Sequence, residues 1–217
     1  MPLSIAIISD VICPWCFVGK RRLERALSDL GLADETVIEW LPFELNPDMP
    51  EDGMPRALYR ERKFGAARSA ALDAEMTRLG REDGIAFAFD RMERTPNTRR
   101  AHMALAFAGE KGRANALKEG LMRAYFEEAR DVGREDVILD IAEAVGLARG
   151  EVAAALQDGG LRDRVVASER RAAEMGVSGV PFFIVDRAWA VSGAQPAEQW
   201  VAALRQASAA AGPAAAP

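Results

Sequence analysis

The chain contains 217 residues, of which 49% are hydrophobic and 28% are charged. This is the composition of an ordinary globular protein that is long enough to bury a substantial hydrophobic core. The formal net charge of −5 at pH 7 argues against general nucleic-acid binding, which relies on clustered positive charge.

The N-terminal residues show no basic region followed by a long apolar stretch before Asp10. A secretory signal needs both features, so we expect a cytoplasmic protein. No run of about 18 residues is apolar and free of charge, so we expect no membrane span and no membrane partner.

The first part of the chain alternates short β-type and helical patterns. Residues 5–9 form an isoleucine-rich run that is too short for a helix and predicts a buried strand. Apolar residues then recur at helical spacing from Leu23 to Leu30, and Gly31 is a typical helix stop. Residues 36–41 contain β-branched and aromatic side chains and predict a second strand.

The remainder of the chain begins with a loop and is then mostly helical. Residues 42–55 contain four prolines and predict a loop. From 58 to about 176 the apolar pattern is helical, and glycines divide it into several helices. Residues 182–185 and 189–191 predict two strands, and Pro196 suits the first turn of a last helix.

The order of these elements predicts the fold class. Without the helical block, the order is strand, helix, strand, strand, strand, helix, which is the arrangement of a thioredoxin fold. We therefore predict an α/β protein in which residues 1–57 and 177–217 form a thioredoxin-like domain. Residues 58–176 would form an inserted all-helical domain that covers one side of the active site.

Both cysteines of the chain lie in the segment Cys13-Pro14-Trp15-Cys16, at the expected start of the first helix. A helix N-terminus favours a thiolate, so we expect Cys13 to be an ionised nucleophile and the more shielded Cys16 to be the resolving thiol. Pro14 stiffens the turn, and Pro14 and Trp15 together tune the reactivity of the pair.

Two other chemistries compete for this cysteine pair. A structural zinc site normally has four ligands, and the chain offers one histidine besides these cysteines, so we expect no metal site. A Cys13–His102 pair of the cysteine-hydrolase type is conceivable, but His102 shares a helical face with apolar residues and is more simply a packing or cleft-lining residue. In a reducing compartment, a CxxC pair near a strand–helix–strand pattern favours redox chemistry.

Two further positions are candidates for the same cleft. Gly179-Val180-Pro181 precedes a predicted strand, and Pro181 could adopt a cis bond facing the cysteines or be a plain loop proline; spacing alone favours neither. Asp10, three residues before Cys13, could transfer protons, although a turn aspartate is the simpler interpretation.

Several segments, taken together, point to one family. They are Asp10-Val11-Ile12-Cys13-Pro14-Trp15-Cys16 with Gly19-Lys20, Phe43-Glu44-Leu45-Asn46-Pro47, Pro96-Asn97-Thr98 with Ala101-His102, Gly179-Val180-Pro181-Phe182-Phe183 and Ser192-Gly193-Ala194-Gln195-Pro196. With these segments the chain resembles the DsbA family of thioredoxin-fold oxidoreductases, and within it the FrnE-like branch. The resemblance implies that Pro181 is a cis-proline and that Val180 and Pro181 lie against the bound thiol or peptide.

The leading functional hypothesis is a thiol–disulfide oxidoreductase or isomerase that acts on protein or small-molecule disulfides and dithiols. It requires no cofactor, and glutathione is a candidate redox partner. The alternative is a glutathione-dependent isomerase or transferase of the 2-hydroxychromene-2-carboxylate isomerase or kappa-class type. Those enzymes resemble this family, but they typically have serine at the position of Cys13 and an Asp-Arg pair after the glycine that corresponds to Gly193. A third hypothesis is a binding module in which the cysteine pair is idle.

Overall fold

A central sheet of four strands organises the molecule, for which a computed structural model describes residues 2–210, with side chains through residue 207. The strand order is β2-β1-β5-β6. The bounds are β1 Ser4–Ser9, β2 Val37–Pro42, β5 Phe182–Val185 and β6 Trp189–Ser192. All four predicted strands are confirmed, each to within one residue at either end.

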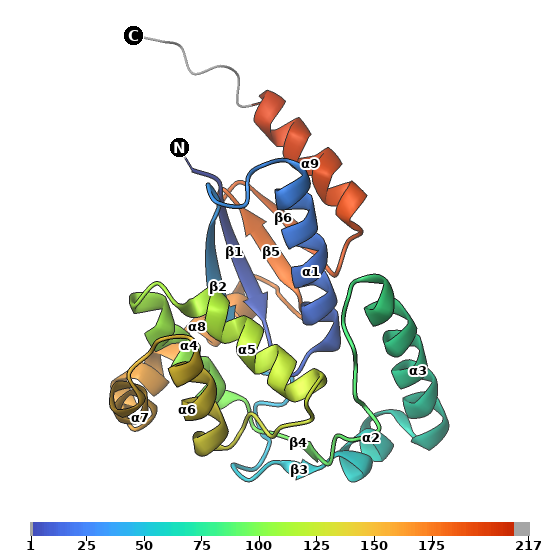
Figure 1. Ribbon diagram of the computed structural model, residues 1–217, viewed down its shortest axis with the longest axis vertical. Helices are drawn as coiled ribbons and strands as arrows, with labels where there is room; N and C mark the ends of the chain where they lie inside the picture. The colour runs from blue at the N-terminus through green and yellow to red at the C-terminus, as the bar shows by residue number, and fades with distance from the viewer. Residues whose placement is uncertain (1, 211–217) are drawn as a thin grey trace.

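The sheet is mixed. β1 pairs in parallel with β2, with Ile5 opposite Ile38, and antiparallel with β5, with Ile7 opposite Phe183. β5 and β6 form an antiparallel hairpin. The parallel pair needs a crossover connection, and α1 (Pro14–Asp29) provides it. α1 packs beside α9 (Ala197–Ala210), as Figure 1 shows.

Seven helices lie between β2 and β5. They are α2 Arg56–Phe64, α3 Ala66–Glu82, α4 Arg99–Glu110, α5 Ala114–Phe126, α6 Glu135–Ala144, α7 Arg149–Leu156 and α8 Gly159–Glu174. α4, α5 and α8 contact the edge strand β2, whereas α2 and α3 project to the other side of α1 (Figure 1).

The expectation of a series of helices from 58 to about 176 is wrong for residues 83–98. α3 ends before Gly84, which has φ of +72°, and the chain continues through turns and irregular segments in which Phe87 packs on Phe126. A short strand, β4 (Arg94–Thr95), follows and pairs with β3 (Met54–Pro55) from the predicted loop.

Pro196 stands at the start of the last helix, as expected. Pro196 precedes α9, and its carbonyl oxygen accepts the backbone N–H of Trp200 at 3.2 Å. Residues 211–217 of the predicted thioredoxin-like domain lie outside the described residues.

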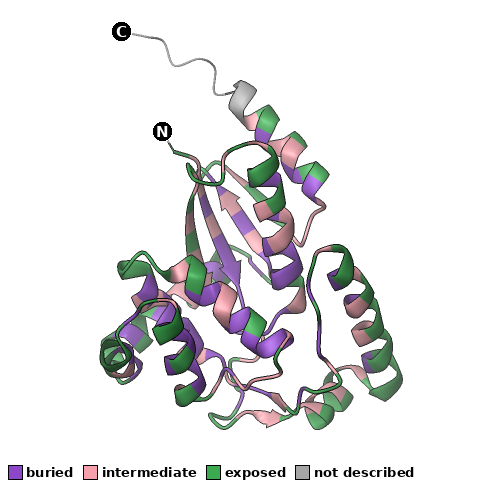
Figure 2. Cartoon of the chain, viewed as in Figure 1, coloured by how far each residue is buried: buried purple, intermediate pink, exposed green. Residues whose placement is uncertain are grey.

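One hydrophobic cluster crosses the predicted domain boundary. It joins Val11, Ile12 and Phe17, at the start of α1, to buried residues of the helices such as Leu121 and Phe126. Figure 2 shows buried residues concentrated where the sheet meets these helices. The division into two domains therefore stays a prediction, and the region around the cysteines is packed by both parts.

No helix in the described part of the chain combines the length and the hydrophobicity needed to cross a membrane.

Candidate active site

The two cysteines are positioned by the turn between β1 and α1. Cys13 is the last extended residue before the helix, with φ of −89° and ψ of 113°. Its carbonyl oxygen accepts the N–H groups of Cys16 at 3.0 Å and Phe17 at 3.3 Å. Cys16 therefore lies in the first helical turn, and both side chains are free thiols.

The two sulfurs differ in access. Both cysteines are buried, Cys13 being 4% and Cys16 1% exposed, but Cys13 lines a cavity of about 370 Å³ to which Cys16 does not contribute. Trp15 also lines the cavity and is 39% exposed, and Pro14 lies beside it at the rim. An incoming disulfide can therefore reach Cys13 before Cys16.

The segment Val180-Pro181 lies directly against Cys13. The Cys13 thiol donates to the Val180 carbonyl oxygen at 3.6 Å, and the Val180–Pro181 bond is cis. This decides between the two interpretations of Pro181 that the sequence left open. No acceptor within residues 2–210 takes a hydrogen bond from the Val180 N–H, so this group is free to pair with a ligand.

The two thiols titrate as a pair. The hydrogen bond with Cys16 and then burial raise the pKa of Cys13 well above its ordinary value. Burial also raises the pKa of Cys16, but the Cys13 thiol, the Lys118 charge and the Ser9 hydroxyl together bring it below its ordinary value. The charge of Lys118 therefore favours the first ionisation of the pair.

The expectation that Cys13 is the ionised cysteine stays a prediction. Lys118, a residue that the sequence analysis missed, is the cation that acts on the pair. It lies on α5, is 1% exposed, and holds its Nζ 5.1 Å from the ring centroid of Trp40. Burial lowers the pKa of Lys118 to about 8, against the opposing effect of the charges on Cys16 and Asp10.

A signal for Lys118 was present in the sequence. It shares a helical face with Leu121, Met122 and Tyr125, which are all buried. A lysine on an apolar face is unusual unless its charge has a partner. What the sequence lacked was the placement of that face beside Cys16.

Asp10 and His102 come together beneath the cysteines. Both are buried, and His102 Nε2 lies 3.4 Å from Asp10 Oδ1 without hydrogen-bond geometry. Asp10 also accepts the backbone N–H of Leu45 at 2.8 Å. The arrangement ties the turn before Cys13 to α4 and to the loop after β2, and neither residue lines the cavity.

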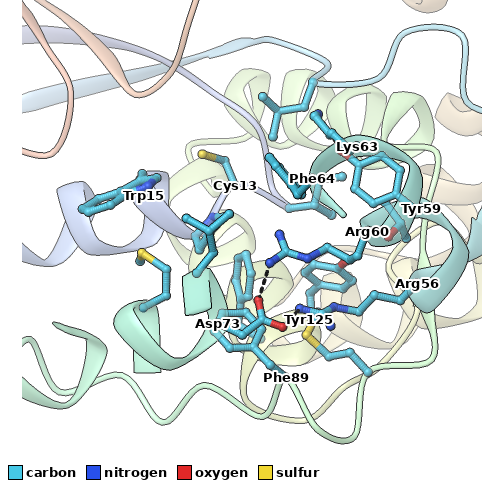
Figure 3. Close-up of a pocket in the computed structure, with 18 of the residues that line it drawn as sticks. Cys13, Trp15, Arg56, Tyr59, Arg60, Lys63, Phe64, Asp73, Phe89 and Tyr125 are labelled. Carbon is cyan, nitrogen blue, oxygen red and sulfur yellow. Dashed lines mark hydrogen bonds and ion pairs between the residues drawn. The ribbon is translucent and has the colours of Figure 1, made fainter. Parts of the chain in front are cut away.

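The wall of the cavity opposite Cys13 is formed by residues that the sequence analysis did not select. Arg56, Tyr59, Arg60 and Lys63 extend from α2, and Asp73 faces them from α3 (Figure 3). The cations recur at helical spacing on α2, which in sequence is typical of a solvated face. No group of three or more His, Cys, Asp or Glu side chains in residues 2–210 is arranged to hold a metal ion.

Comparison with known proteins identifies the family. The model of the DSBA-like thioredoxin domain matches residues 4–205. A probable DsbA oxidoreductase from Streptomyces coelicolor, known from a crystal structure, is 35% identical to this chain in sequence. The match covers 99% of this chain and 94% of the Streptomyces protein, with a TM-score of 0.88. The chain belongs to the DsbA-like thioredoxin-domain family. The FrnE-like branch within this family stays a prediction.

More distant members of the DsbA-like fold show the range of proteins that share it. A 2-hydroxychromene-2-carboxylate isomerase is 17% identical with a TM-score of 0.70, and the coverage is 96% of this chain and 95% of the isomerase. The cytosolic disulfide reductase DsbM from Pseudomonas aeruginosa, solved with GSH (glutathione), is 19% identical with a TM-score of 0.67, at 95% and 99% coverage. At these identities the likeness concerns the fold.

Proposed function

We propose that this DsbA-like protein is a dithiol–disulfide oxidoreductase in which Cys13 attacks and Cys16 resolves. The observation that carries the proposal is the pair of free thiols at the start of α1, of which only Cys13 opens into a cavity. Access decides which sulfur meets the substrate. The cis-proline segment beside Cys13 adds an unpaired N–H where a substrate backbone would lie.

The exchange proceeds in two balanced steps. The Cys13 thiol gives up its proton and attacks one sulfur of a substrate disulfide, and the other substrate sulfur leaves as a thiolate that takes up a proton. Cys16 then gives up its proton, attacks Cys13 Sγ in the mixed disulfide and releases the second substrate half, which is protonated to a thiol. Two electrons have moved from the protein dithiol to the substrate, and Cys13 and Cys16 form a disulfide.

A second thiol must then reduce the protein. We propose glutathione as this redox partner and a cytoplasmic location as the setting, where the glutathione pool supplies electrons. The chain's chemistry needs no further cofactor. Oxidation and reduction use the same steps in opposite directions, and the reduction potential of the pair decides which one dominates.

Reduction of insulin disulfides tests the proposal. Cys13→Ser should abolish turnover because no attacking sulfur reaches the cavity. Cys16→Ser should also stop turnover but accumulate a mixed disulfide between Cys13 and the substrate, visible by mass spectrometry. Turnover by the Cys13→Ser variant at the rate of the unmodified protein would refute the assignment.

The glutathione-dependent isomerase or transferase is the second candidate, favoured by the shared fold of the chromene-carboxylate isomerase. Such an enzyme uses glutathione as a bound cofactor, so its turnover would survive Cys16→Ser. Here Cys13 replaces the serine typical of that group and Ala194-Gln195-Pro196 follows Gly193, so the proposal favours dithiol chemistry.

A further inference from the structure

The cavity in front of Cys13 has an apolar body. Ile12, Leu72, Met76 and Phe126 contribute to it, together with the ring of Phe89. Its volume of about 370 Å³ is within the range of small-molecule sites. The cavity is therefore suited to a compact, apolar group attached to the sulfur that Cys13 attacks.

The residues that line this cavity carry more positive than negative charge. There are three cations, Arg56, Arg60 and Lys63, and one carboxylate, Asp73. Asp73 is shared, since Oδ2 binds Arg56 at 2.7 Å and Oδ1 binds Arg60 at 2.7 Å. One carboxylate thus leaves an excess of positive charge on the α2 wall (Figure 3).

The third cation has neutral partners. Lys63 Nζ lies 2.6 Å from the Tyr59 hydroxyl and 3.3 Å from Asn46 Oδ1. No carboxylate in the described part of the chain lies within ion-pairing distance of it. The guanidinium of Arg60 lies 4.7 Å from the centroid of the Phe64 ring, which holds the cation in place without neutralising it.

We infer that the substrate of this site is a low-molecular-weight disulfide. One half of this disulfide is aromatic or otherwise apolar and carries a carboxylate. The apolar group fills the cavity, the disulfide meets Cys13, and the carboxylate binds the cations of α2. Arginine and lysine are the natural donors to such a group. This inference rests on the proposed function and names its substrate class.

The exchange with such a substrate is balanced in the same way. Cys13 bonds to one sulfur, the substrate S–S bond breaks, and the second half leaves as an anionic thiolate. Cys16 then closes the protein disulfide and releases the first half as a thiol. A low-molecular-weight thiol added to the solution restores the dithiol by two further exchanges.

The test compares two aromatic disulfides in single-turnover reactions of the full reduced protein. Dithiobis(nitrobenzoate) carries two carboxylates, and dithiodipyridine is neutral at pH 7. The ratio of the two second-order rate constants cancels differences in the reactivity of the protein thiols. Lys63→Gln should lower the anionic-to-neutral ratio by about threefold to fivefold, as for the loss of one partly solvated charge.

Two control variants separate local charge from net charge. Lys63→Arg keeps the cation, so its anionic-to-neutral ratio should stay close to that of the unmodified protein. Lys111→Gln removes an exposed lysine that lies outside the cavity and pairs with Glu151, so it should leave the ratio unchanged. High salt should reduce the ratio of the unmodified protein, because it screens exposed charges.

The outcomes distinguish this inference from the function on which it rests. An unchanged ratio in Lys63→Gln, or an equal fall in Lys111→Gln, overturns the substrate class while disulfide exchange at Cys13 stands. If neither disulfide reacts faster with the protein than with a free thiol and Cys13→Ser reacts equally well, the proposed function fails and the inference fails with it.

Discussion

At the scale of single residues, Lys118 favours ionisation of the cysteine pair. A cation in a buried position acts through a low dielectric and is weakly screened by salt. Lys118 is buried beside Cys16, and its effect on that thiol is the largest of any charged side chain. It acts through Cys16, which makes it a positioning residue for the exchange.

Replacing Lys118 by methionine should raise the lower pKa of the cysteine pair by about one pH unit, because an opposite charge near the thiolate is lost. The thiolate absorbance in the far ultraviolet, followed as a function of pH, measures this pKa. Lys118→Arg keeps the charge and should preserve the lower pKa. Identical titration curves for Lys118→Met and the unmodified protein would show that Lys118 does not favour ionisation of the pair.

A cluster of partly buried charges should make stability depend on pH. Glu169 on α8 lies 3.9 Å from Arg99 on α4, and Arg99 is also paired with Glu44. Burial first, and then the charge of Glu44, raise the pKa of Glu169 from 4.5 to about 8. Between these two pH values the folded protein keeps a proton that the unfolded chain releases, so stability falls as pH rises.

Glu169→Gln removes this dependence because glutamine resembles the protonated acid. Compared with the unmodified protein, the variant should gain more in Tm near pH 8.5 than near pH 5. Thermal melts at the two pH values measure the difference. Glu174→Gln, an exposed position on the same helix, serves as the control. A Tm gain for Glu169→Gln that is equal at both pH values would show that the carboxyl is ionised across this range in the fold.

At the scale of elements, the approach of α1 to the cis-proline segment needs a glycine. A Cβ at Gly19 would lie 3.0 Å from Pro181 Cγ and 3.3 Å from Phe183 Cζ. Gly19→Val should lower the free energy of unfolding by about 1–3 kcal/mol, the usual cost of overpacking. Denaturant titration measures it. Gly109→Val, in α4 with no neighbour within 4 Å of its Cβ, should be close to neutral, and equal losses in both variants would refute the contact.

The sequence predicted the elements that depend on local patterns and missed those that depend on distant contacts. The strands around Ile5 and Phe183 carry their own β-type composition, so their existence was predictable. The non-helical path of residues 83–98 brings Phe87 against Phe126 and Phe17 of α1, which no local pattern reports.

The candidate site divides in the same way. Cys13 and Cys16 were identified by spacing, whereas the role of Pro181 was implied only by the resemblance to the DsbA family. Lys63 and its neighbours on α2 have the pattern of a solvated helix, and only the position of Cys13 across the cavity shows otherwise. The same pattern of cations on a helix can face solvent or line a cavity. Which of the two occurs depends on the tertiary structure, which the local sequence does not report.

At the scale of the whole molecule, the shared hydrophobic cluster joins the sheet region and the helical segment. Phe17 of α1 packs on Phe126 of α5 with ring centroids 6.0 Å apart, and Phe87 packs on both rings. If the sheet region and the helical segment separated, these aromatic rings would be exposed to water. The two parts are therefore expected to unfold together.

The tryptophans allow this expectation to be tested. All four of them (Trp15, Trp40, Trp189 and Trp200) lie outside residues 58–176, whereas most of the helix lies within that segment. Tryptophan fluorescence and circular dichroism should therefore report the same midpoint during urea unfolding. Phe126→Ala should shift both midpoints equally, at a cost of about 3–5 kcal/mol. If Phe126→Ala moves only the circular dichroism transition, the helical segment unfolds by itself and its packing does not set the position of Cys13.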